Sequence, residues 1–167
     1  MERKLGITNL FRGDLGELIY EHYSINQKYA YLKTEEVYKS FTLDDKLTFR
    51  YGWERINVKV PRVVEEEIRK FAKPSNYNDA NPSFVFDYLS MSLRQSFDYD
   101  ETKKMHVPKP CLSGKAFNWI EIKTGNSPLS ENQIRGRRDS KIGVCIFRIG
   151  LEEANLDKIK INSIIEK

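Results

Sequence analysis

The chain contains 167 residues, of which 28 are basic and 24 acidic, so its formal net charge is +4. Its length and its content of 31% charged and 40% hydrophobic residues are typical of one globular domain, which excludes a disordered or fibrous protein. Two cysteines and two histidines are too few for a disulfide framework or a zinc-ligand cluster, and the absence of an 18-residue apolar stretch argues against a membrane protein.

The first half of the chain predicts a helix, a hairpin and a second helix. Asp14 and Glu17 have the spacing of a capping box, so we expect the first helix to begin near Asp14. Residues 29–41 fit either a helix or a loop. Alternating apolar residues on both sides of a turn near Gly52 predict a β-hairpin, and Pro61 then opens a helix that ends near Lys73. This hairpin and helix, at about 44–73, form an insertion in the predicted domain.

The second half begins with a predicted strand at 84–93, because Phe84, Val85, Phe86 and Tyr88 favour strands. The polar, proline-containing segment at about 94–116 is expected to be a long loop beside the active site. A strand, a helix and a second strand are then predicted at 117–123, 131–140 and 144–149. The tail at 151–167 is expected to be a peripheral helix or strand.

Glu121 and Lys123 are the first candidates for chemistry. In a strand they point to one face, while Ile120 and Ile122 point to the other and would pack under a helix. The pair can be an ordinary surface ion pair, which contributes little to stability. Its sequence context favours a functional interpretation, because a turn, a helix and a glycine-led strand follow directly.

This context resembles the PD-(D/E)XK nuclease superfamily, and most of all its virus-type replication–repair nuclease branch (VRR-NUC). The resemblance covers about residues 117–149: the E-x-K pattern of Glu121 and Lys123, the Leu-Ser-x-x-Gln run at 129–133, and the strand beginning at Gly143. It extends more weakly to Asp87 and to the helix that contains Glu17. It implies a restriction-endonuclease-like fold, in which helices flank a central mixed sheet of four or five strands, within one domain spanning residues 1–167.

Phosphodiester hydrolysis needs an activated water and stabilisation of the charge that develops in the transition state, and a divalent cation held by carboxylates supplies both. Mg²⁺ accepts a few protein oxygens and keeps several waters, and Mn²⁺ is expected to substitute for it. The resemblance implies that Asp87, Glu121, the main-chain carbonyl of Ile122 and Glu17 hold the metal. Lys123 would orient the attacking water or offset the developing charge.

Two of these metal ligands, Asp87 and Glu17, have alternatives in the sequence. Asp98 and Asp100 lie nearer to Glu121 in the sequence than Asp87 does, and either can replace it. Glu21 lies one helical turn after Glu17 and can replace that residue.

Gln133 has two expected roles. Ser130 and Gln133 have the spacing of a capping box at the start of the helix. The resemblance implies in addition that this glutamine lies beside the metal or the scissile phosphate. One side chain can serve both purposes.

Positive charge is concentrated in residues 103–148, which contain ten basic and three acidic residues, a net charge of +7. Such an excess attracts polyanions, and phosphate contacts of this kind give affinity without sequence readout. The residues expected to bind nucleic acid are Lys103, Lys104, Arg135, Arg137, Arg138 and Lys141.

The sequence therefore predicts a Mg²⁺-dependent deoxyribonuclease, more specifically an endonuclease acting on duplex or branched DNA in repair or recombination. A homodimer is expected if both strands are cut, because this takes two sites. The alternative is a nucleic-acid-binding module of the same fold without cleavage activity. The first 13 residues contain no apolar run of signal-peptide length, so we expect an intracellular location: the cytoplasm or nucleoid, or the host cell if the chain is viral.

Overall fold

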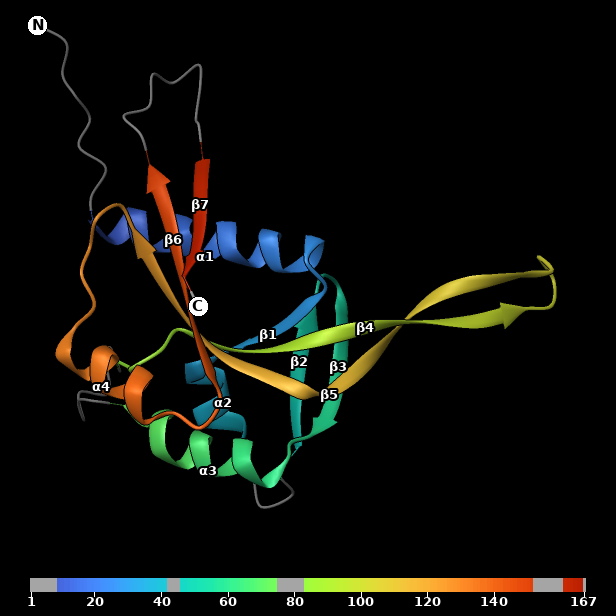
Figure 1. Cartoon of the computed structure of the whole chain (residues 1–167), viewed down its shortest axis with the longest axis horizontal. Coiled ribbons are helices and arrows are strands. Elements are labelled where there is room, and N and C mark those ends of the chain that lie inside the picture. Colours follow the sequence, from blue (N-terminus) through green and yellow to red (C-terminus); the bar gives the residue numbers. More distant parts are fainter. Residues whose placement is uncertain (1–8, 42–45, 75–82, 152–160, 167) are drawn as a thin grey trace, which may run out of the picture.

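The computed structural model describes residues 9–41, 46–74, 83–151 and 161–166 (Figure 1). The helices are α1 (Asn9–Asn26), α2 (Thr34–Ser40), α3 (Arg62–Phe71) and α4 (Glu131–Asp139). The strands are β1 (Tyr29–Lys33), β2 (Lys46–Tyr51), β3 (Glu54–Lys59), β4 (Tyr88–Asp100), β5 (Met105–Thr124), β6 (Gly143–Leu151) and β7 (Ile161–Glu166). No helix in these ranges is long and apolar enough to cross a membrane.

One mixed sheet joins all the described strands in the order β3-β2-β1-β4-β5-β6-β7. Neighbouring strands are antiparallel except β5 and β6, which are parallel and are connected through α4. A parallel pair needs such a crossover, because a tight turn can only reverse the chain. The predicted α/β class with a mixed sheet is confirmed, but the sheet has seven strands rather than the four or five expected.

Helices cover both faces of the sheet (Figure 1). On one face, α1 packs over a core that is largely aromatic and contains Tyr20, Tyr31, Tyr88 and Phe147. On the other face, α2, α3 and α4 enclose the larger core, in which Phe86 stacks on Trp119 with ring centroids 5.6 Å apart. Ile120 and Ile122 pack in the α1 core, as their alternation predicts.

The first helix starts before its predicted boundary. Helix α1 includes Asn9, so Asp14 lies inside the helix and the predicted N-cap and capping box there are wrong. The buried positions are spaced by one turn, at Gly16, Tyr20 and Ser24. A Cβ at Gly16 would lie 3.1 Å from Thr124 Cγ2 and 3.2 Å from Ile122 Cγ2, so glycine lets α1 approach the end of β5.

The segment 29–41, which fits a helix or a loop by sequence, contains strand β1 followed by the short helix α2. Three consecutive residues of β1 are buried, so it lacks the alternation that marks a half-exposed strand. The predicted hairpin and helix of the insertion are confirmed as β2, β3 and α3. The hairpin turns at Gly52, whose φ of +58° favours glycine.

The structure corrects the predictions for 84–116. Strand β4 begins at Tyr88, so Val85, Phe86 and Asp87 precede it. The predicted long loop at 94–116 is instead an antiparallel arm, formed by the far ends of β4 and β5 and paired from Leu93–Leu112 to Asp100–Met105. The arm projects from the body, away from the start of β4 after Asp87 and from the end of β5 that contains Glu121 (Figure 1). It is therefore neither a loop nor beside the candidate site.

The strand, helix and strand predicted at 117–123, 131–140 and 144–149 are present in β5, α4 and β6. The capping box of α4 is confirmed: Gln133 N donates to Ser130 Oγ (3.3 Å), and Ser130 N donates to Gln133 Oε1 (2.9 Å). The tail pairs with β6 as strand β7, while residues 152–160 lie outside the described part.

Gly136 fixes how closely α4 approaches the sheet. A Cβ there would lie 2.9 Å from Phe86 Cζ, and this ring is confined by Phe71 and Trp119. Although alanine favours a helix by about 1 kcal/mol over glycine, overpacking costs roughly 1–3 kcal/mol. We therefore expect Gly136→Ala to lower the free energy of unfolding by about 1 kcal/mol, measured by urea denaturation.

Gly13→Ala is the matched control, because a Cβ at this position in α1 meets nothing within 4 Å. It should raise the free energy of unfolding by up to about 1 kcal/mol. Equal stabilisation by both substitutions would contradict the close approach of α4 to Phe86.

Candidate active site

The candidate site, which we call the Asp87–Glu121 corner, lies where β4 begins and β5 ends. These strands are antiparallel and Tyr88 pairs with Ile120, which places Asp87 beside Glu121. The main chain fixes this corner, since Asp87 N donates to Ile120 O (2.9 Å). Ile122 N donates to the Asp87 carboxylate at Oδ2 (2.7 Å). The 34-residue separation in sequence is bridged by the long antiparallel arm.

The register of β4 against β5 decides between Asp87 and the two alternative aspartates, Asp98 and Asp100. Asp98 and Asp100 lie on the arm, where their main chains pair with Val107 and Met105. Asp100 Oδ1 accepts hydrogen bonds from the main chain of Thr102 and Lys103 at the tip. Neither position reaches the end of β5 that contains Glu121, so only Asp87 of these three aspartates can share a site with it.

Glu121 is almost fully buried, with 3% of its surface exposed. Its Oε1 lies 2.9 Å from Lys123 Nζ and accepts a 2.6 Å hydrogen bond from Gln133 Nε2. Its other oxygen, Oε2, is buried and has no hydrogen-bond donor among the described residues. A buried carboxylate oxygen without a partner is costly, and either a proton or a cation would remove that cost.

Burial raises the proton affinity of both carboxyl groups, and the charge of Asp87 raises that of Glu121 further. Burial, reinforced by the charge of Asp87 and opposed by Lys123, raises the pKa of Glu121 to about 8. Burial raises the pKa of Asp87 to about 6, although the hydrogen bond from Ile122 N acts in the opposite direction. Without a cation, the pair therefore retains a proton near neutral pH.

Gln133 caps α4 and contacts Glu121 with the same side chain. Its Oε1 completes the capping box of α4, while its Nε2 donates to Glu121. The capping box fixes the side chain at the start of the helix, and Gly136 lets the helix approach the sheet one turn later. Local sequence and packing thus hold the amide against the buried carboxylate.

Glu17 and Glu21 lie on the α1 side of this corner. Glu17 Oε2 lies 2.7 Å from Lys33 Nζ, and Glu21 Oε1 accepts a 2.9 Å hydrogen bond from Tyr88 OH. The charge of Glu17 also contributes to the raised pKa of Asp87. Both glutamates contact the Tyr88 hydroxyl, and Glu17 is the one whose charge acts on Asp87.

Three further residues escaped the sequence analysis. Lys33 ends β1, pairs with Glu17 and lies 6.0 Å from the centre of the Tyr88 ring. Tyr88 follows Asp87 and donates to Glu21 from the opposite face of the sheet. Glu67, only 1% exposed, accepts hydrogen bonds from Trp119 Nε1 (3.2 Å), Ser140 Oγ (2.5 Å) and Lys141 N (3.0 Å), so it ties α3 to the end of α4.

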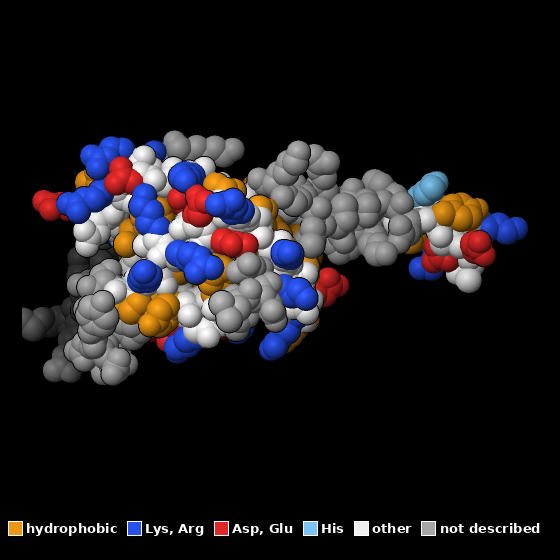
Figure 2. All heavy atoms as spheres, turned by 90° about the horizontal axis from the view of Figure 1, so that it is seen from below, with side chains coloured by type: hydrophobic (Ala, Val, Ile, Leu, Met, Phe, Trp, Pro, Cys, Tyr) orange, Lys and Arg blue, Asp and Glu red, His pale blue; other side chains and the backbone are white. Residues whose placement is uncertain are grey.

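The predicted nucleic-acid-binding residues fall on two separate surfaces. Arg135, Arg137 and Arg138 are exposed on α4, and Lys141 follows it. Lys103 and Lys104 are instead at the tip of the arm. Figure 2 shows basic side chains interspersed with acidic ones on the lower face of the body, and the arm tip standing apart. Arg138 contacts Asp139 and Lys141 contacts Glu66, each at the surface.

A divalent cation fits this donor set only in part. Within the described residues, no group of three or more His, Cys, Asp or Glu side chains is arranged to hold a metal. The Asp87–Glu121 pair supplies two carboxylates and a buried oxygen without a partner. This is compatible with Mg²⁺, which needs few protein ligands because it retains several waters.

The comparisons with known proteins are negative. No family model, curated protein or solved structure matches the chain.

Proposed function

We propose that the chain is a Mg²⁺-dependent deoxyribonuclease that hydrolyses phosphodiester bonds at the Asp87–Glu121 corner. The observation that carries the proposal is the buried carboxyl pair, with Glu121 Oε2 lacking a hydrogen-bond donor among the described residues. Asp87, Glu121 and the main-chain carbonyl of Ile122 would hold the cation, and Glu17 would adjust the site from α1. When bound, such a cation supplies a nucleophilic water and Lewis-acid stabilisation of the phosphate.

Each polar side chain of the site has a distinct task in this proposal. Lys123 is held 2.9 Å from Glu121, so it can orient the attacking water and offset charge that develops on the phosphate. Gln133 orients the Glu121 carboxylate through its 2.6 Å hydrogen bond. Lys33 balances the charge of Glu17 beside the pair.

The order of the elements supports assignment to the PD-(D/E)XK superfamily, most like its VRR-NUC branch. A helix containing Glu17 comes first, followed by a strand that starts after Asp87 and a strand containing Glu121 and Lys123. A helix containing Gln133 and a closing parallel strand complete the order that the sequence resemblance implies. The insertion β2–β3–α3 extends this arrangement at one edge of the sheet and on one face.

The surface of α4 supports a polyanionic substrate. Its basic side chains follow Gln133 directly along the chain, so they would bind phosphates next to the proposed cleavage site. The exposed ion pairs of Arg138 and Lys141 cost little to break when a phosphate competes.

Incubation of supercoiled plasmid with metal-free protein and added Mg²⁺ or Mn²⁺ tests the function. We expect cation-dependent nicking that chelator abolishes, and direct linearisation if two copies act together as a dimer. Substrate binding without nicking under either cation would instead favour the alternative of an inactive DNA-binding module.

A comparison of Lys123 with the basic helix separates cleavage from binding. Lys123→Ala should slow single-turnover cleavage about a hundredfold, because one contact to the transition state is lost. The double substitution of Arg137 and Arg138 to alanine should instead weaken DNA binding and reduce its salt dependence. The charge-matched control is the double substitution of Lys46 and Lys59 to alanine, at two positions that pair across β2 and β3. It should change neither the cleavage rate nor DNA binding. A Lys123→Ala variant that only binds more weakly would contradict the role given to this lysine.

A further inference from the structure

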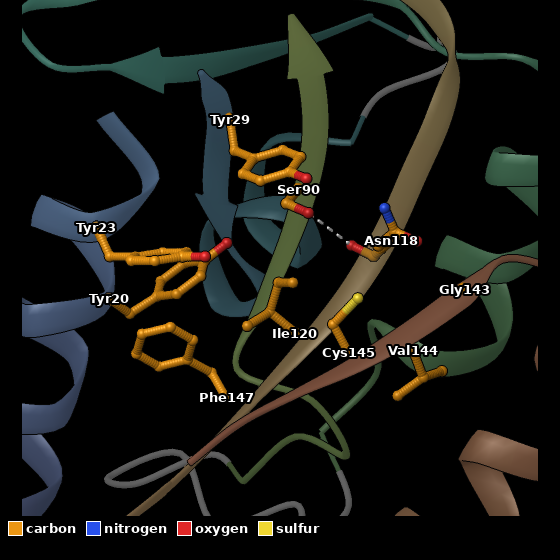
Figure 3. Close-up of a pocket in the computed structure, with 10 residues that line it drawn as sticks. All are labelled: Tyr20, Tyr23, Tyr29, Ser90, Asn118, Ile120, Gly143, Val144, Cys145 and Phe147. Atoms are coloured by element: carbon orange, nitrogen blue, oxygen red, sulfur yellow. Dashed lines mark hydrogen bonds between the residues drawn. The ribbon is translucent and has the colours of Figure 1, made fainter. Parts of the chain in front are cut away.

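A cavity lies between α1 and the sheet, separate from the Asp87–Glu121 corner. It has a volume of about 320 Å³ and contains none of the proposed metal ligands in its lining. Figure 3 shows side chains from α1, β1, β4, β5 and β6 around it. Ile120 lines this cavity, whereas the next residue, Glu121, points to the opposite face of the sheet.

Aromatic rings form much of the cavity wall. Tyr20 and Tyr23 both contact Phe147, with centroid separations of 5.4 and 4.9 Å, and Tyr29 completes the aromatic part of the lining. Because Tyr20 and Phe147 are buried in the α1 core, these rings are held in place by packing. A wall of fixed rings favours a flat ligand that can stack against it.

The remaining wall offers hydrogen bonds but no formal charge. Ser90 Oγ donates to the main-chain carbonyl of Asn118 (3.3 Å). Within the described part of the chain, no side chain or main-chain group is hydrogen-bonded to the Asn118 side-chain amide. This amide lies against Gly143, where a Cβ would be 2.1 Å from Asn118 Oδ1. Glycine at the start of β6 thus makes room for the Asn118 amide, a group that can both donate and accept hydrogen bonds.

Among the described residues, no Asp, Glu, Lys or Arg lines the cavity, so these residues provide no ion-pair partner for a phosphate or carboxylate. Its volume is at the small end of the range for ligand pockets, roughly 300–1,000 Å³, which excludes a long acyl chain or a large cofactor. A small, uncharged, planar heterocycle with donor and acceptor atoms in its plane fits every part of the lining.

We propose that this cavity binds a nucleobase, stacked on the tyrosine wall and hydrogen-bonded by the Asn118 amide. An amide can pair with a neighbouring donor and acceptor on a base edge, while aromatic side chains bind the face of the ring. The base can belong to a free nucleoside or to the end of a single strand, and both present the same ring to the cavity.

Titration of the protein with the four nucleosides and with a short single-stranded oligonucleotide, in the presence of chelator, tests the proposal. Occupancy should slow alkylation of Cys145, a half-buried thiol in the lining, when Cys111 is replaced by serine. Protection by a nucleoside identifies a free ligand, and protection by the oligonucleotide alone identifies a base in a strand. Ribose 5-phosphate should not protect, because it lacks the ring.

Two substitutions locate the binding site. Asn118→Ala should weaken binding about tenfold through loss of the amide pair, and Tyr23→Leu about tenfold through loss of stacking. Asn126→Ala and Tyr38→Leu are matched controls at exposed positions outside the lining, and they should bind like the parent chain. Thermal unfolding of each variant checks that it is folded.

Absence of binding by every nucleoside and oligonucleotide at about 1 mM would overturn the proposal. Binding that neither protects Cys145 nor responds to Asn118→Ala or Tyr23→Leu would overturn it as well. Because chelator is present and Glu121 does not line the cavity, either failure would leave the proposed metal-dependent cleavage untouched. Conversely, an inactive plasmid assay would leave this test valid.

Discussion

Glu121→Gln is expected to reduce cation-dependent cleavage about a thousandfold, at the upper end of the effect of a single transition-state contact. The glutamine side chain preserves size but removes a proposed metal ligand and the anionic partner of Lys123. DNA affinity should change little, because it rests on the basic groups, and removal of a negative charge beside phosphate can strengthen it. Single-turnover cleavage and a binding titration measure the two quantities separately.

Asp87→Asn should have a similar effect, since its carboxylate is the second ligand of the proposed pair. Asp100→Asn is the control, because this aspartate lies at the far tip of the arm and bonds only within its turn in the described structure. Full cleavage by Glu121→Gln would contradict the proposed active site. Full cleavage by Asp87→Asn alone would remove Asp87 from the ligand set.

The stability of the metal-free protein is expected to fall as the pH rises from about 5 to about 9. Both carboxyl groups have raised pKa values in the folded state, about 6 for Asp87 and about 8 for Glu121. The folded chain therefore binds protons that the unfolded chain has already released. The stabilisation is fully present below the unfolded pKa values, roughly 4, and is lost as the pH passes through the folded values.

Urea denaturation across this pH range should show a loss on the order of 5 kcal/mol. Glu121→Gln should remove most of the slope, whereas the exposed control Glu54→Gln should retain it. Saturating Mg²⁺ should stabilise the protein more at the alkaline end, because ligands must be deprotonated to bind it. Stability that is independent of pH, or that rises with pH, would contradict the buried carboxyl pair.

Local patterns predicted the central part of this structure correctly. The alternation around Glu121, the capping box of Ser130 and Gln133, and the glycine that opens β6 act over a few residues, so the sequence alone determines the elements they define. Pairing of Glu121 with Lys123 on one face follows from strand geometry in the same way.

Features that depend on distant contacts were missed. Strand β1 is buried on both faces and lacks alternation, and the projecting arm at 94–116 has the polarity and prolines of a loop. Glu67 lies on the apolar stripe of α3 formed by Val64, Ile68 and Phe71, which was the available signal for a buried carboxylate. Its partners come from β5 and from the end of α4, and no local pattern specifies them.

Titration of metal-free protein with Mn²⁺ near neutral pH, where the pair retains a proton, tests most directly whether Asp87 and Glu121 hold a divalent cation. We expect stoichiometric binding with proton release, lost in Glu121→Gln and Asp87→Asn and retained in Asp100→Asn. Undiminished Mn²⁺ affinity in Glu121→Gln, or no binding by the parent chain, would contradict this metal site.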